Sequence, residues 1–104
     1  MGFQWVKGDD AANNILAYVR WGVDATPVLA VVNLSGASQP NYRLGLPEAG
    51  EWELLLNTDD AVYGGAGNDL PLVQHTEAVE WDRFEQSAEF HVPAMSAQYY
   101  ILRR

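Results

Sequence analysis

The chain has 104 residues, enough for one small domain with a single hydrophobic core but too few for a barrel enzyme with its own cleft. Hydrophobic residues make up 48% of it and charged residues 19%, so it has enough apolar surface to fold. The 14 acidic residues against 6 Lys and Arg give a formal net charge of -8, which disfavours nucleic acid and anionic membrane surfaces as partners.

The beginning of the chain carries no targeting signal that we recognise. Met1 to Asp10 holds no apolar run preceded by basic residues, and no stretch approaches the ~20 apolar residues that a membrane-spanning helix needs. The chain also lacks cysteine, which suits a reducing compartment. These features predict a soluble, cytoplasmic protein.

Short apolar runs separated by Gly, Pro, Asn and Asp predict an all-β chain. Asp9 to Asn14 is the loosest segment, which we interpret as a turn or a short helical approach to the first strand. Asn14 to Trp21 and Pro27 to Leu34 then predict two strands. The second of these is a nearly continuous apolar run, of the kind that is buried on both faces of a sheet.

The middle of the chain predicts a hairpin. Tyr42, Leu44 and Leu46 recur at period two, Pro47 to Gly50 has the composition of a turn, and Glu51 to Asn57 is a second apolar run. A short turn most simply joins antiparallel neighbours, so we expect these two strands to pair.

A long loop and three more strands complete the prediction. Thr58 to Pro71 contains four Asp or Asn, three Gly and one Pro, which cannot hold a regular ladder. An edge strand over Ala78 to Phe84 and strands over Ser87 to Val92 and Gln98 to Leu102 follow. About seven strands favour an antiparallel β-sandwich with Greek-key connections, in one domain over residues 1–104.

One segment resembles a known family. Trp52 to Asn68 reads WELLLNTDDAVYGGAGN, which is similar to the signature of the C-terminal all-β domain of 1,4-α-glucan (glycogen) branching enzymes, in the α-amylase superfamily. The resemblance extends to Val31–Leu34, to Tyr42–Pro47 and to Val92–Ala97, where Ala94 replaces the family's usual second Pro. Gly2 to Trp5 is similar to the family's passage out of the catalytic barrel, which makes residues 1–13 a junction.

The resemblance implies a function for the whole protein. It makes the chain the non-catalytic C-terminal domain of a branching enzyme, a glycosyltransferase that forms α-1,6 branches in glycogen, with a large N-terminal portion ahead of Met1. The barrel motifs of that family are not present in this sequence, so we expect no catalytic residue, no cofactor and no enzyme activity in the segment itself. The implied partner is the catalytic barrel of the same parent chain, which the domain would stabilise. A second partner that the resemblance implies is α-glucan (glycogen).

The Asn-Thr-Asp-Asp run is interpreted first as an Asx or Ser/Thr turn that ends a strand. Its alternative, Asp59 and Asp60 as an acid and base pair or as cation ligands, lacks a third carboxylate at regular spacing. The Gly-rich run after it has no following Lys-Ser/Thr and no helix, so a nucleotide site is disfavoured. We predict that this region contacts the barrel, with a self-packed loop as the alternative; the predicted interface residues are Asn57, Asp59, Tyr63, Gly64 and Gly65.

Aromatic residues are the candidates for sugar binding, because their faces stack on glucose rings. Trp52 lies between Glu51 and Glu53 and is predicted to be buried, whereas Trp81 lies in the polar stretch EWDRFE and is the candidate sugar platform, together with Tyr63. The two histidines are isolated in sequence, so no metal site is predicted. Two further functions were considered: a free-standing α-glucan-binding module and an unrelated immunoglobulin-like interaction domain.

Overall fold

A computed structural model describes residues 2–10, 13–22, 24–59 and 70–103. These residues form eight strands and no helix: β1 (Gly2–Asp10), β2 (Ile15–Trp21), β3 (Pro27–Asn33), β4 (Gln39–Leu46), β5 (Glu51–Asn57), β6 (Val73–His75), β7 (Gln86–Val92) and β8 (Ser96–Arg103). Within the described residues there is accordingly no helix long and apolar enough to cross a membrane.

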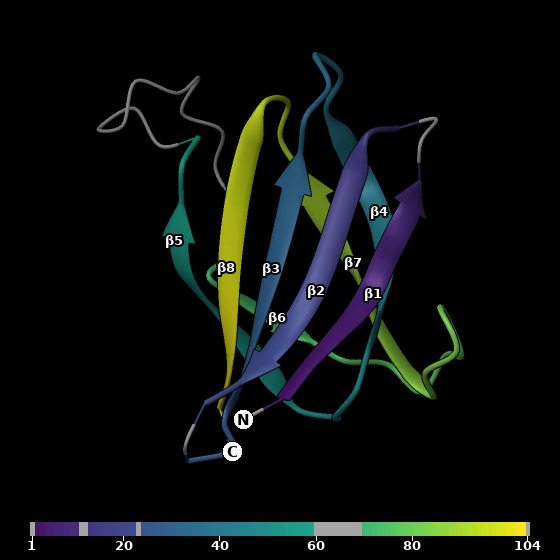
Figure 1. Cartoon of the computed structure of the whole chain (residues 1–104), viewed down its shortest axis with the longest axis vertical. Helices are drawn as coiled ribbons and strands as arrows, with labels where there is room; N and C mark the ends of the chain where they lie inside the picture. The colour runs from purple at the N-terminus through teal and green to yellow at the C-terminus, as the bar shows by residue number, and fades with distance from the viewer. Residues whose placement is uncertain (1, 11–12, 23, 60–69, 104) are drawn as a thin grey trace.

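The strands form two antiparallel sheets. The larger has six strands in the order β1-β2-β3-β8-β5-β6, and the smaller pairs β4 with β7. Figure 1 looks onto the larger sheet, with β4 and β7 behind it. The chain changes sheet on each side of β4 and of β7, and β8 returns to lie between β3 and β5. This arrangement confirms the predicted all-β sandwich, with eight strands in place of about seven.

The core lies between the two sheets. Alternate residues of β2 (Ile15, Ala17 and Val19) are fully buried, as expected for a strand with one covered face. Phe90 of β7 meets Tyr100 of β8 edge to face across the layers, with ring centroids 4.9 Å apart. Burial raises the pKa of the Tyr100 hydroxyl well above its ordinary value, because the charged form would be desolvated. Burying side chains of this size contributes about 1.5–3 kcal/mol each.

The predicted hairpin between the fourth and fifth strands is wrong. β4 pairs with β7, whereas β5 pairs with β8 and β6, so residues 47–50 carry the chain from one sheet to the other. This crossing places Leu46 and Trp52 in one core cluster from opposite layers. Trp52 is fully buried, as predicted, and its Nε1 donates to the Glu48 carbonyl at 3.3 Å. Gly50 permits the crossing, since it has φ 144°.

The first strand was not predicted from the sequence. Gly2–Asp10 forms β1, which pairs with β2 despite its Gly and charged residues, because register shifts after Trp5 and Lys7 accommodate them. Asp9 and Asp10 belong to this strand, so of the two interpretations of Asp9 to Asn14, a turn or a short helical approach, the helical one is wrong at its start. A turn does follow at Asn13 and Asn14, and Asn14 has φ 53°, which Asn tolerates better than most residues.

The predicted edge strand over Ala78 to Phe84 is also wrong. Trp81 and Phe84 form an isolated bridge around a tight turn, in which Asp82 and Arg83 have φ values of 51° and 73°. Two successive positive φ values turn the chain back on itself and prevent a longer ladder. Of the predicted long loop, residues 60–69 lie outside the described residues, and β6 follows it unpredicted.

Candidate functional site

The end of β5 holds the first predicted site residues in a buried hydrogen-bond network. Asn57 and Asp59 are 3% and 5% exposed. The Asn57 Oδ1 accepts from the Asp59 backbone N–H at 3.0 Å and from the Gln98 Nε2 at 2.9 Å. The Asx turn is therefore confirmed. Gln98 Oε1 is buried and has no hydrogen-bond partner among the described residues.

The other predicted interface residues, Tyr63, Gly64 and Gly65, lie outside the described residues, as does Asp60. The proposed pairing of Asp59 with Asp60 is therefore untested. The described part of the chain contains no cluster of three or more His, Asp or Glu that could hold a metal ion.

Trp81, the predicted sugar platform, is 45% exposed at the start of the tight turn over residues 81–84. The turn lies on β4 at Gly45, where an added Cβ would come 2.2 Å from the Trp81 carbonyl oxygen. The Gly45 N–H donates to the Asp82 Oδ2 at 3.0 Å, which fixes the turn to the strand. Only glycine allows this approach.

A pocket of about 490 Å³ opens beside this turn, where β1 of the large sheet faces β4 of the small one. We call it the edge pocket; it is lined by Lys7, Asp10, Asn41, Tyr42, Arg43, Trp81 and Glu89. Most of this lining comes from three elements that are far apart in sequence: β1, β4 and the turn over residues 81–84. None of these residues except Trp81 was predicted as a site residue.

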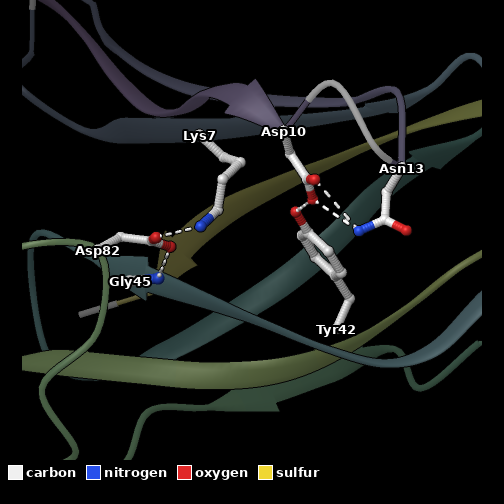
Figure 2. A network of polar contacts seen from close by, with 6 residues as sticks. All are labelled: Lys7, Asp10, Asn13, Tyr42, Gly45 and Asp82. Atoms are coloured by element: carbon white, nitrogen blue, oxygen red, sulfur yellow. Dashed lines mark hydrogen bonds and ion pairs between the residues drawn. The ribbon is translucent and has the colours of Figure 1, made fainter.

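Polar contacts join the two sheets at the edge pocket (Figure 2). The Lys7 ammonium pairs with the Asp82 carboxylate, and the Tyr42 hydroxyl donates to the Asp10 carboxylate. Asn13 Nδ2 donates to the same carboxylate, at 3.0 Å to Oδ2. Burial raises the pKa of Asp10, but the hydrogen bonds from Tyr42 and Asn13 and the Lys7 charge outweigh it, so the pKa lies below the ordinary 3.8.

The side of the six-stranded sheet that faces away from the core is unusually apolar. Residues directly opposed in antiparallel strands share a face. One such row crosses five strands and contains only apolar or aromatic residues: Trp5, Tyr18, Ala30, Tyr99 and Leu56. We call this side the outer face; it is the side toward the viewer in Figure 1.

The outer face carries large exposed side chains at both of its ends. Phe3 and Trp5 are 52% and 47% exposed at one end, and Leu56 is 37% exposed at the other. Phe3 stacks on Tyr18 with centroids 5.2 Å apart, and Trp5 meets Phe3 edge to face at 5.4 Å. The sequence signal for this face was the run from Pro27 to Leu34, whose pattern predicts burial on both sides.

The described contacts do not bring the two predicted sites together. Asn57 and Asp59 belong to the junction of β5 with β8, whereas Trp81 contacts β4 and lines a pocket with β1. In the six-stranded sheet, β1 and β5 are separated by β2, β3 and β8. The chain therefore offers separate candidate surfaces.

Two packed antiparallel sheets with a buried core define the chain as an all-β sandwich domain. A family profile described as "Alpha amylase, C-terminal all-beta domain" matches residues 5–103, and the chain belongs to this family. The match confirms the resemblance drawn from Trp52 to Asn68 and runs against an unrelated immunoglobulin-like domain.

Several curated relatives are 1,4-alpha-glucan branching enzymes GlgB. The chain is 54% identical to that of Corynebacterium glutamicum over 103 residues, which are 99% of this chain and 14% of that protein. Identity to the enzyme of Corynebacterium diphtheriae is 48%, over 95% of this chain and 14% of that protein. Identity to the Thermobifida fusca enzyme is 38%, over 96% of this chain and 14% of that protein. The chain thus spans about one seventh of the length of these relatives.

Proposed function

We propose that this chain is the non-catalytic C-terminal domain of a cytoplasmic 1,4-α-glucan branching enzyme, and that it stabilises the catalytic barrel of the same parent chain. The names and lengths of the relatives support its place in a branching enzyme, since this chain matches only 14% of the length of each of the three enzymes described above. The parent's work would be to form α-1,6 branches in glycogen, with all of the chemistry in the barrel.

The observation that carries the docking role is the outer face. Strands about 4.8 Å apart give its five-strand apolar row a width of about 19 Å. Monomeric proteins rarely leave large contiguous apolar surfaces in water. Because β3 is apolar on both sides and only one side meets the small sheet, the other side fits a second protein layer. The large remainder of the parent chain is the nearest available partner.

The predicted interface at the loop complements this surface. Asn57 and Asp59 are buried inside the chain, so their proposed contribution is to fix the direction in which the loop leaves β5. Tyr63, Gly64 and Gly65 remain the residues that we propose to touch the barrel directly. The proposed junction over residues 1–13 includes Phe3 and Trp5. These two residues of the outer face would therefore lie next in sequence to the end of the barrel.

The test is a comparison of one substitution in two contexts. Phe3→Ser should lower the unfolding temperature of the complete parent enzyme by about one to two degrees, because it removes apolar contact with the barrel. The matched control is Val79→Ser, at a residue 42% exposed between β6 and β7, which should leave the parent unchanged. In the chain of residues 1–104 alone, Phe3→Ser should cost less than in the parent, because only its ring contacts with Trp5 and Tyr18 are lost there. Equal effects of the two substitutions in the parent would contradict the docking role.

Contact with α-glucan is the second candidate function, as in a glucan-binding module. One observation favours it: Trp81 is exposed, as the sequence predicted, and lines a pocket rather than a flat surface.

A further inference from the structure

The edge pocket combines an exposed indole with a polar lining. Its volume of about 490 Å³ lies within the range of roughly 300–1,000 Å³ that is typical of small-molecule sites. Trp81 contributes an apolar ring, and Asn41 of β4 contributes an exposed side-chain amide with both donors and an acceptor.

The charges in the pocket lining are matched. Lys7 and Arg43 are the cations, and Asp10 and Glu89 are the anions. The Arg43 Nη2 lies 3.5 Å from the Glu89 Oε2, and Lys7 is paired with the carboxylate of the tight turn. An anionic ligand would meet as much repulsion as attraction here. A neutral ligand with many hydroxyl groups could donate to the carboxylates and accept from the amide without disturbing the ion pairs.

The turn that carries Trp81 is rigidly held. The Trp81 and Phe84 backbones exchange two hydrogen bonds, of 3.0 and 2.9 Å. Asp82 and Arg83 adopt positive φ, a conformation that is unfavourable for non-glycine residues and often occurs at binding sites. The contact with Gly45 and the pairing of Asp82 with Lys7 hold this conformation in place. The Trp81 backbone is therefore fixed before any ligand arrives, which lowers the entropy cost of binding.

We propose that the edge pocket is a binding subsite for a neutral oligosaccharide, in which Trp81 stacks on the apolar face of a sugar ring and Asn41 and Glu89 bind its hydroxyl groups. The choice of α-1,4-linked glucose as the sugar rests on the proposed function. The subsite lies outside the catalytic barrel, so it would hold the glucan chain without taking part in bond cleavage.

The experiment uses the complete parent enzyme in native gels cast with and without amylose. Trp81→Ala should weaken the apparent affinity for amylose about two- to twelvefold, the loss expected when one aromatic stacking contact is removed. Trp81→Phe should restore part of the retardation. The control is Leu72→Ala, at an apolar residue 71% exposed and outside the pocket lining, which should migrate like the parent. The turnover number on a short donor glucan should not change.

Two results would contradict the proposal, each at a different step. Equal retardation of Trp81→Ala and Leu72→Ala by amylose would overturn the subsite itself. An equal loss of affinity by Trp81→Ala in gels cast with the α-1,6-linked glucan dextran would overturn the choice of α-1,4-linked glucose as its ligand. Unfolding temperatures of all variants are measured alongside, and Trp81→Ala is expected to match the parent because the ring is half exposed. The docking role is tested separately, by the unfolding temperature of the parent enzyme carrying Phe3→Ser, so either proposal can fail while the other stands.

Discussion

Position 45 leaves no room for a methyl group, because the turn over residues 81–84 lies directly on the strand. We predict that Gly45→Ala destabilises the chain by about 1–3 kcal/mol, since the added Cβ must displace the Trp81 carbonyl from 2.2 Å. The matched control is Gly36→Ala, where an added Cβ meets no atom within 4 Å. This control should be neutral or slightly stabilising. Denaturant unfolding of both variants tests the prediction, and equal midpoints would contradict it.

Asp10 and Tyr42 give the second prediction at the scale of single residues. The pKa of Asp10 is lowered in the folded chain, so its contribution to stability is present above pH 3.8 and is lost as the pH falls through the folded value. Tyr42→Phe removes the hydroxyl that donates to this carboxylate. It should cost about 1 kcal/mol at pH 7 and progressively less as the pH falls below 3.8 and through the folded pKa, because the charge on the accepting carboxylate is then lost.

Unfolding curves from pH 7 down to pH 3 measure this difference. Tyr18→Phe, on the outer face, is the control and should change stability by the same amount at every pH. A constant penalty for Tyr42→Phe across the range would show that the hydroxyl acts through packing alone.

At the scale of elements, the joint between β5 and β8 depends on Asn57. We predict that Asn57→Ala costs about 2–4 kcal/mol, because it strands two buried donors, the Gln98 Nε2 and the Asp59 N–H, at about 1–3 kcal/mol each. Ser96 remains as an acceptor for the Gln98 amide and limits the loss. The control is Asn41→Ala on exposed backbone of β4, expected within about 0.5 kcal/mol. A similarly small loss for Asn57→Ala, measured by thermal unfolding, would refute the network's role.

Strands were predictable from the sequence where burial sets the pattern. Pro27 to Leu34 and Glu51 to Asn57 became β3 and β5 almost residue for residue, because an apolar run must be buried somewhere. The Asx turn at Asn57 was also predictable, since it depends only on neighbouring residues. Trp81 was placed correctly in solvent by its polar neighbours.

Features that depend on distant residues were not predictable. The turn after Leu46 looks like a hairpin turn, and only the pairing with β7 shows that it crosses between sheets. β1 contains two Gly and three charged residues, so its strand character comes from pairing with β2 and not from its own pattern. The edge pocket was not predictable for the same reason, since Lys7 and Tyr42 line it together only when the two sheets pack.

At the scale of the whole molecule, the net charge and the outer face act against each other. The charge of -8 keeps copies apart at neutral pH, while the row of apolar side chains from Trp5 to Leu56 favours association. The calculated isoelectric point is about 4.4, so repulsion vanishes as the pH approaches that value. If the outer face docks on the barrel as proposed, association of the parent chain should depend far less on pH.

We therefore predict that residues 1–104 alone are monomeric at pH 7 and associate increasingly toward pH 4.5, close to the isoelectric point of about 4.4. Phe3→Ser should suppress this association because it breaks the exposed aromatic cluster, whereas Val79→Ser, away from that cluster, should not. Sedimentation velocity at both pH values measures the change, and high salt at pH 7 should produce part of the same effect by screening the charges. If the Phe3 variant associates as strongly as the unmodified chain, then association uses another surface and does not involve the outer face.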